Sequence, residues 1–401
     1  MKENELQREI YALVRDGKLA EHISSRGVRS LKGFIKAART ESYEFSMIKI
    51  LRDRYAKSAL WIYRKLSEEI MSIIGGENTS NISLNGVERL YPDILAHNEE
   101  RNFFLFELKV GSKTEREAIT EIFVYIFEVR NHLPGLNIGE ISIIIISESF
   151  GVLLSHAVMQ LIGFYGVKVI CLRARRHQEL ILELYNPSEV ITDNEVPLSK
   201  ESFSTCSLVL YHSGQRSRRA NQDIMKVFNV AEGMLLERAN QLGSNGFLVL
   251  YRNSLSDDWD GCVARFYITI AIINPFKLLD ELMLGARTTP LAKRLYEMYL
   301  EESDHLQNHF GEIVEECEDF LGKFYNVSRE TYASYDMFER SVVGWDSYAL
   351  RCNSWGEFGR FVRGITYGGS NAYGFFDSER DHTDPIDFFE TLNNIFECGA
   401  Y

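Results

Sequence analysis

The clearest pattern of hydrophobic and polar positions lies between residues 91 and 146. An aromatic and apolar run at 102–106 follows the polar stretch 97–102, which predicts two strands joined by a hairpin turn. Pro92 stands at the start of the first strand, where a missing N–H does little harm. The run 141–146 is apolar at both alternating positions, which is typical of a strand buried on both faces of a sheet.

Helical patterns flank this hairpin on both sides. Residues 115–132 predict a helix, with Thr114 as its N-cap and Glu117 as the capping-box partner. A second helix is expected to run from residue 57 through residue 74, ahead of the hairpin. Further strands are expected at 167–172 and 179–184.

The same patterns divide the chain into parts. Residues 1–50 read as charged amphipathic helices, and residues 51–187 as an α/β domain with a mixed central sheet flanked by helices. The polar, proline-containing stretch 186–204 predicts a linker. Residues 205–401 are expected to form a separate C-terminal α+β domain, whose role in recognition, regulation or partner binding stays open.

Composition narrows the class of protein. A hydrophobic content of 45% and an aromatic content of 12% indicate an ordered globular chain. No apolar run approaches the ~20 residues that span a bilayer, and the N-terminus lacks the apolar core of a signal peptide. The six cysteines form no CxxC pair, which argues against a zinc site or a disulfide framework. We therefore expect a cytoplasmic protein with no membrane partner.

The formal net charge of −13 argues against indiscriminate binding of nucleic acid, because such binding requires Lys and Arg to neutralise phosphates. Two local basic clusters could supply those cations. Arg173, Arg175 and Arg176 are expected to follow the strand 167–172. The second cluster, in a polar loop after a strand at 207–211, contains Arg216, Arg218 and Arg219. Both clusters are candidates for nucleic-acid binding, and the alternative is an ordinary solvated surface.

The candidate chemistry lies in the hairpin. Strand side chains alternate between faces, so Glu107 and Lys109 project to one side while Leu108 points into the core. The hairpin can bring Asp93 opposite them, and two carboxylates with an ammonium suit metal-assisted hydrolysis of a phosphodiester. The competing interpretation is a turn carboxylate beside a surface ion pair worth well under ~1 kcal/mol. The order of the three residues and their strand, turn and helix context favour the metal site.

With these residues in place, the segment resembles the PD-(D/E)xK nuclease superfamily. The resemblance is carried by Pro92-Asp93, by Glu107-Leu108-Lys109 and by the helix at 117–126. Many members carry a glutamine followed four residues later by a tyrosine in that helix. Tyr125 matches the tyrosine, whereas Glu121 stands in place of the glutamine. The resemblance covers roughly residues 50–185 and implies a restriction-endonuclease-like fold.

The resemblance also implies a catalytic mechanism. Asp93 and Glu107 would bind one or two Mg²⁺ ions, for which Mn²⁺ could substitute, and the Leu108 carbonyl would complete the coordination. Lys109 would orient or help to deprotonate the attacking water and offset charge in the transition state. Tyr125 would be an auxiliary catalytic residue.

Many members of the superfamily add a glutamate from the helix that precedes the first strand. Glu68 and Glu69 fall in the corresponding helix, and Glu88 lies just before the hairpin. We favour Glu69 as the additional metal ligand.

Three functions are compatible with this sequence. The first is a Mg²⁺-dependent endonuclease acting on DNA, in anti-phage defence or DNA repair. The second is a non-catalytic protein on the same fold that binds nucleic acid or assembles with proteins. The third is a nuclease acting on RNA. A homo-oligomer or a regulatory protein partner is compatible with each of them.

Overall fold

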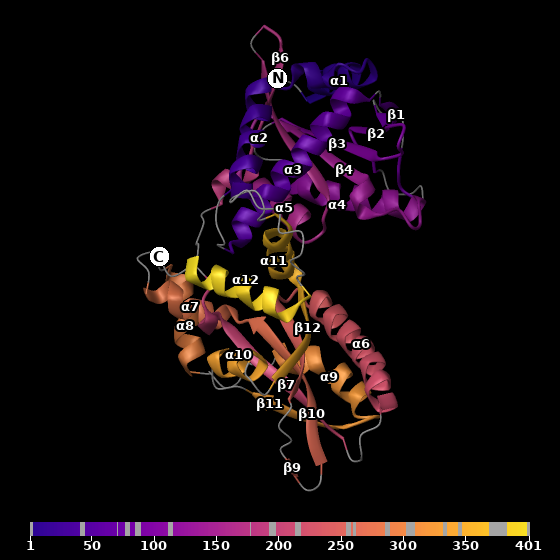
Figure 1. Ribbon diagram of the computed structural model, residues 1–401. Helices are drawn as coiled ribbons and strands as arrows, with labels where there is room; N and C mark the ends of the chain where they lie inside the picture. Colours follow the sequence, from indigo (N-terminus) through magenta and orange to yellow (C-terminus); the bar gives the residue numbers. More distant parts are fainter. Residues whose placement is uncertain are drawn as a thin grey trace. The chain divides into compact units, whose positions relative to one another are not determined.

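The structure is a computed structural model, and its chain forms two compact units (Figure 1). The first unit contains Met1–Glu41 and Met47–Asp193, and the second contains Ser42–Ser46 and Asn194–Tyr401. The residues that the structure describes are 3–40, 45–69, 71–76, 81–84, 90–110, 115–176, 178–191, 198–212, 218–253, 258–259, 262–284, 289–301, 309–331, 335–343, 347–368 and 383–398.

A six-stranded mixed sheet forms the centre of the first unit. Its strands are β1 (Ser72–Gly76), β2 (Ile94–His97), β3 (Phe103–Lys109), β4 (Ile141–Ser147), β5 (Lys168–Arg176) and β6 (Leu180–Leu184). They lie side by side in chain order. β3, β4 and β5 are parallel, whereas β1, β2 and β6 join their neighbours antiparallel. All seven residues of β4 are buried, which confirms the expected central strand.

Helices cover both faces of this sheet. They are α1 (Glu3–Arg15), α2 (Ser25–Thr40), α3 (Met47–Glu68), α4 (Glu115–His132) and α5 (Val152–Gly163), with short 3₁₀ turns η1 (Leu19–His22), η3 (Ile138–Glu140) and η4 (Pro187–Val190). On one face Trp61 of α3 stacks on Phe104 of β3, with the ring centroids 6.3 Å apart. On the other face Glu121 of α4 contacts Lys109 at the end of β3. The mixed sheet with flanking helices is the expected α/β architecture.

Two expectations about local structure need correction. The helix expected through residue 74 ends at Glu68, and residues 72–76 form β1 instead. Ile73 and Ile74 are β-branched and fit a strand, and β1 gains its hydrogen bonds from the sequence-distant β2. The helix expected at 115–132 is confirmed with these bounds, whereas its proposed N-cap Thr114 lies outside the described residues.

The second correction concerns β5. The strand continues to Arg176, so the basic cluster is part of the strand and does not follow it. The buried Ala174 and the pairing of Arg175 with Ile181 of β6 keep this end of β5 in the sheet. The N-terminal helices α1 and α2 also belong to the first compact unit, whereas we expected residues 1–50 as a segment of their own.

The second unit is built on an antiparallel sheet in the order β11-β7-β10-β8-β12, with β9 paired to β10. Its strands are β7 (Phe203–His212), β8 (Gly246–Asn253), β9 (Asp258–Trp259), β10 (Cys262–Ile273), β11 (Asn326–Thr331) and β12 (Ser347–Trp355). Its helices are the 3₁₀ turn η5 (Lys200–Ser202), α6 (Arg218–Gln241), α7 (Pro275–Leu284), α8 (Pro290–Glu301), α9 (His309–Leu321), α10 (Tyr335–Val343), α11 (Gly356–Gly368) and α12 (Pro385–Cys398). A C-terminal unit with helices and an antiparallel sheet is the expected α+β arrangement.

An aromatic core holds α10, α11 and α12 against this sheet. Phe247 of β8 lies within 5.1–6.3 Å, between ring centroids, of Phe338, Phe358 and Phe388, which come one from each helix. Phe45, from the short segment between α2 and α3, also belongs to the second unit and packs edge-on against Phe358 at 5.7 Å. The second unit thus includes residues from two separate parts of the sequence.

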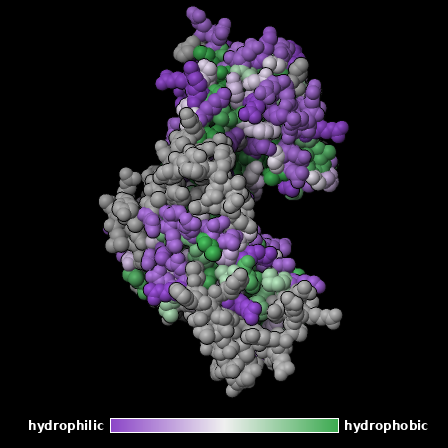
Figure 2. All heavy atoms as spheres, in the orientation of Figure 1, coloured by the Kyte–Doolittle hydropathy of each residue, from purple (hydrophilic) through white to green (hydrophobic). Residues whose placement is uncertain are grey.

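No helix in the described part of the chain is long and apolar enough to cross a membrane. On the first unit, the surface turned to the viewer in Figure 2 is largely hydrophilic, and green apolar patches interrupt it only locally.

We predict that Gly151→Ala destabilises the protein by about 1–3 kcal/mol. The Gly151 N–H donates to Glu115 Oε1 at 2.6 Å, and a Cβ atom at Gly151 would push the end of the Glu115 side chain away and break this charge-assisted hydrogen bond. Chemical denaturation measures the loss. Gly139→Ala is the matched control, because the nearest atom to its new Cβ is Lys168 Nζ at 3.7 Å. Equal stability of both variants would contradict this packing.

Candidate metal-binding active site

The β2–β3 hairpin brings Asp93 to the end of β3 that carries Glu107 and Lys109. Ile94 pairs with Phe106, so Asp93 lies opposite Glu107 in the antiparallel register. The Asp93 carboxylate accepts a hydrogen bond from the Leu108 N–H at 2.7 Å through Oδ2. Its backbone carbonyl accepts another from Gln7 Nε2 of α1 at 3.2 Å. Asp93 is therefore fixed from two sides.

Glu107 is a buried carboxylate whose side chain is only 3% exposed. Lys109 Nζ lies 2.8 Å from its Oε1, which makes an ion pair, but the two groups are not aligned as a hydrogen bond, and Oε1 accepts none. Burial, and then the neighbouring charge of Asp93, raise the pKa of Glu107 to about 9, against the opposing effect of Lys109. The site therefore contains a buried oxygen that lacks a hydrogen-bond donor.

The pKa of Asp93 is raised, as is the pKa of Glu107. Burial raises the pKa of Asp93 to about 6, although the Leu108 N–H and the Lys109 charge favour the ionised form. Two neighbouring carboxylates that resist ionisation are typical of a site built for a cation. The oxygen atoms of Asp93 and Glu107 therefore fit a hard divalent ion.

The number of acidic side chains limits the kind of metal site. Among the residues that the structure describes, no three His, Cys, Asp or Glu side chains are grouped so that they could hold a metal ion. Mg²⁺ is compatible with this set, because it is often held by one or two carboxylates and keeps waters or substrate phosphates as its other ligands. Asp93 and Glu107 would have to bind it in this way.

Lys109 lies between two carboxylates. Its Nζ is 2.9 Å from Glu121 Oε2 of α4, in addition to the contact with Glu107. Burial lowers the pKa of Lys109, but the two carboxylates outweigh burial, so the pKa is raised overall. Lys109 is thus an ammonium ion that donates hydrogen bonds in this arrangement.

Tyr125 lies close to the same group of charges. Burial and the carboxylates of Glu107, Glu121 and Asp93 raise the pKa of Tyr125, so its hydroxyl stays protonated. That hydroxyl donates to the backbone carbonyl of Tyr91 at 2.9 Å. In this structure Tyr125 therefore fixes the chain two residues ahead of Asp93.

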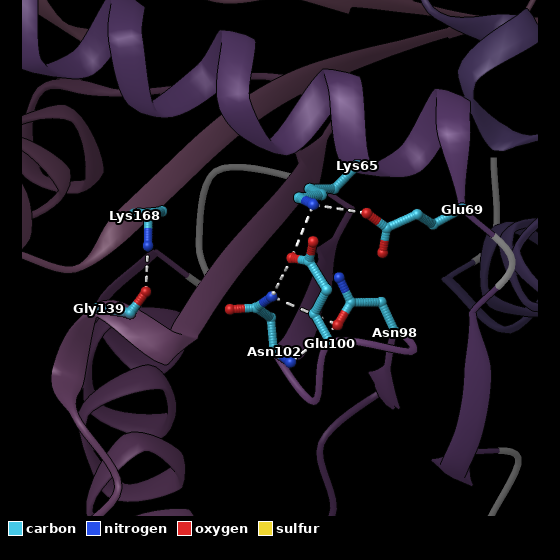
Figure 3. A network of polar contacts seen from close by, with 7 residues as sticks. All are labelled: Lys65, Glu69, Asn98, Glu100, Asn102, Gly139 and Lys168. Atoms are coloured by element: carbon cyan, nitrogen blue, oxygen red, sulfur yellow. Dashed lines mark hydrogen bonds and ion pairs between the residues drawn. The ribbon is translucent and has the colours of Figure 1, made fainter.

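Glu69, the favoured additional metal ligand, is not brought to this end of the hairpin. Glu69 pairs with Lys65 at 2.6 Å, and Lys65 in turn contacts Glu100 in the β2–β3 turn at 2.7 Å (Figure 3). The turn lies four residues of β3 away from Glu107, a distance of about 13 Å along a strand. Glu68 is exposed at the end of α3, and Glu88 lies outside the described residues.

The expected basic cluster at 173–176 is divided by the alternation of β5. The Arg173 guanidinium lies over the Tyr185 ring, 4.7 Å from its centroid. Arg175 Nε lies 3.6 Å from Glu183 Oε2, and Arg176 forms an ion pair with Glu9 of α1. Arg173 and Arg175 share a face with Glu107 and Lys109, whereas Arg176 points to the opposite face.

The second basic cluster is only partly described. Arg216 lies outside the described residues. Arg218 and Arg219 begin helix α6, which corrects their expected position in a loop. Their role in nucleic-acid binding stays a prediction.

Sequence reasoning did not identify two partners of the site. Glu121 was noted only as a departure from the superfamily pattern, yet it forms an ion pair with Lys109. The sequence offered one signal for this contact, which is the position of Glu121 six residues after the start of helix α4. Gln7 contacts Asp93 from 86 residues away, and no local pattern indicates such a contact.

Comparison of the chain with protein-family models, curated proteins and solved structures finds no match.

We predict that Glu107→Gln raises stability at pH 8 by about 1–3 kcal/mol in metal-free buffer. The pKa of Glu107 is about 9 in the folded protein against an ordinary value of 4.5, so the folded state binds the extra proton between these pH values. Wild-type stability should therefore fall as the pH rises from 4.5 to 9, and the variant should lose this dependence above pH 6, where Asp93 with its pKa of about 6 no longer contributes.

Urea denaturation at several pH values in EDTA measures this effect. Glu117→Gln is the control, because Glu117 is exposed on α4. Parallel stability curves for wild type and Glu107→Gln would show that Glu107 is not a strained carboxylate.

We predict that Tyr125→Phe reduces stability by about 1 kcal/mol and lowers any activity of this site less than 10-fold. The variant keeps the buried ring and loses only the hydrogen bond to the Tyr91 carbonyl. Turnover and thermal denaturation of the same preparation test this. A loss of activity as large as that of Asp93→Ala would assign Tyr125 a direct part in the chemistry.

Proposed function

We propose that this protein is a Mg²⁺-dependent endonuclease of the restriction-endonuclease-like fold that hydrolyses phosphodiester bonds in DNA. The observation that carries the proposal is the buried Glu107 Oε1, which accepts no hydrogen bond, opposite Asp93 and beside the Lys109 ammonium. Burying this carboxylate costs stability that the Lys109 ammonium offsets only in part, and a bound divalent cation would offset more of that cost. The mixed six-stranded sheet and the order of α3, the hairpin, α4 and β4 support the same fold.

Each residue has a definite task in this proposal. Asp93 and Glu107 hold Mg²⁺ or Mn²⁺, with the Leu108 carbonyl as a further ligand. Such an ion, when bound, activates a water molecule and withdraws charge from the phosphoryl oxygens. Lys109 donates hydrogen bonds to the attacking water or to a non-bridging oxygen as a cation, because its raised pKa disfavours a role as a base. Tyr125 and Gln7 keep Asp93 in position.

A non-catalytic assembly protein is the second candidate function, and the burial of Glu107 argues against it. A protein that only binds would be more stable with a neutral or apolar residue at this position. An RNA substrate remains the alternative within the nuclease class. The second unit would supply target recognition, regulation or partner binding, in a role in genome defence or DNA repair.

We predict cleavage of plasmid or single-stranded DNA in Mg²⁺ or Mn²⁺ and none in EDTA. Asp93→Ala, Glu107→Gln and Lys109→Met should each lower the rate at least 100-fold, because the first two remove a proposed metal ligand and the third removes the ammonium. Gel assays on plasmid, single-stranded DNA and RNA measure the rates and distinguish the substrates.

Glu69→Gln is the matched control, because Glu69 pairs with Lys65 near the hairpin turn and should leave the rate within 3-fold of wild type. Activity in EDTA, or in Asp93→Ala, would overturn the metal site. Mn²⁺ should also raise the melting temperature of wild type and not of Glu107→Gln, which tests metal binding without any substrate.

A further inference from the structure

Arg173 lies level with the proposed catalytic residues on the same face of the sheet. Lys109 of β3 pairs in register with Ser147 of β4, and Ser147 pairs with Arg173 of β5. These three strands are parallel, and Lys109 and Ser147 are the last residues of β3 and β4, whereas β5 continues three residues beyond Arg173. Two strand spacings, about 10 Å in total, separate the backbones of Lys109 and Arg173.

The residue between them is small. Ser147 is buried, and its hydroxyl donates to the Ser149 carbonyl at 2.6 Å. β4 therefore places no long side chain between Lys109 and Arg173 at this level, although the burial of Ser147 means that other residues cover the sheet directly above it.

Arg173 is held by an aromatic ring. Its guanidinium lies 4.7 Å from the centroid of the Tyr185 ring. That ring is buried, stacks on Phe150 at 4.4 Å, and has its hydroxyl 3.1 Å from Ser155 Oγ of α5. A guanidinium stacked on a ring keeps its N–H groups available for an oxyanion.

Arg173 also differs from the other arginines of β5. Arg175 and Arg176 are each in an ion pair with a glutamate. Within the described part of the chain, no carboxylate forms an ion pair with Arg173. The Arg173 guanidinium is half-buried, and the Tyr185 ring fixes it without using its N–H donors. Such a group is suited to bidentate binding of phosphate.

We propose that Arg173 binds a phosphate adjacent to the scissile one on the same strand, so that the substrate is a polynucleotide with at least two consecutive phosphates. This inference rests on the proposed nuclease function. It makes Arg173 a substrate-binding residue that selects a polynucleotide over a single phosphodiester. Arg175 and Arg176 are not required for this contact.

The test compares two substrates in Mn²⁺. One is a fluorescein-labelled single-stranded DNA 12-mer, and the other is bis(4-nitrophenyl) phosphate, which has one diester and no neighbouring phosphate. Arg173→Ala should lower kcat/KM for the 12-mer about 10–100-fold, mainly through KM, and leave the rate on bis(4-nitrophenyl) phosphate within 2-fold. Arg173→Lys should recover part of the loss. Arg130→Ala, which removes an exposed cation from α4, is the matched control.

Binding of the same 12-mer in EDTA tests the contact without catalysis. Arg173→Ala should weaken binding about 10-fold and reduce the salt dependence by about one counterion, whereas Arg130→Ala should not. Thermal denaturation and circular dichroism confirm that each variant is folded.

The outcomes separate the two proposals. Wild-type protein that cleaves neither substrate in Mg²⁺ or Mn²⁺ argues against the nuclease, and the binding arm still decides whether Arg173 contacts phosphate. Equal 12-mer binding by Arg173→Ala and Arg130→Ala overturns the Arg173 proposal. A folded Arg173→Ala that loses activity equally on both substrates also overturns it, because that result indicates general disturbance of the catalytic centre.

Discussion

The burial of Glu107 beside Asp93 is the constraint around which the first unit is organised. Removing two carboxylates from water is costly, and a single ammonium offsets that cost only in part. Lys109 lies two residues along the same strand, where the alternation of side chains places it on the same face. Glu121 of α4 is a second carboxylate in contact with Lys109. The arrangement costs stability in the absence of a ligand, as is common where a protein must bind a cation.

The topology explains why these groups meet at one edge of the sheet. The hairpin turn lies at one end of β2 and β3, so Asp93 and Glu107 are left together at the other end. β4 and β5 run parallel to β3 and add their carboxyl ends to the same edge, where ligands of open α/β sheets are bound. Helix α1 returns from the N-terminus to bind the Asp93 backbone through Gln7. Asp93 is therefore held both by its hairpin partner strand and by a residue 86 positions away in the sequence.

The sequence predicted those elements that depend on contacts between residues close together in the chain. Local periodicity predicted α4, β4 and the hairpin, because turn residues and alternation are encoded within a few positions. It failed at β1, which became a strand by pairing with β2, and at the end of β5, which β6 holds in the sheet. Asp93, Glu107 and Lys109 could be predicted as one candidate site, because the alternation of strand side chains and the hairpin pairing bring them together. The ion pair of Lys65 with Glu100 and the stacking of Arg173 on Tyr185 depend on tertiary packing and left no pattern in the sequence.

The place of Phe45 has a consequence for how the chain is made. Phe45 packs against Phe358 and Phe361, yet it leaves the ribosome some three hundred residues before them. The aromatic layer of the second unit therefore cannot be completed in the order of synthesis, and its earliest member must wait for the last helices. A fragment beginning at Asn194 would lack this ring, so dividing the chain at one point does not yield two whole units. Co-translational folding of the first unit would have to leave Ser42–Ser46 accessible until the end of synthesis.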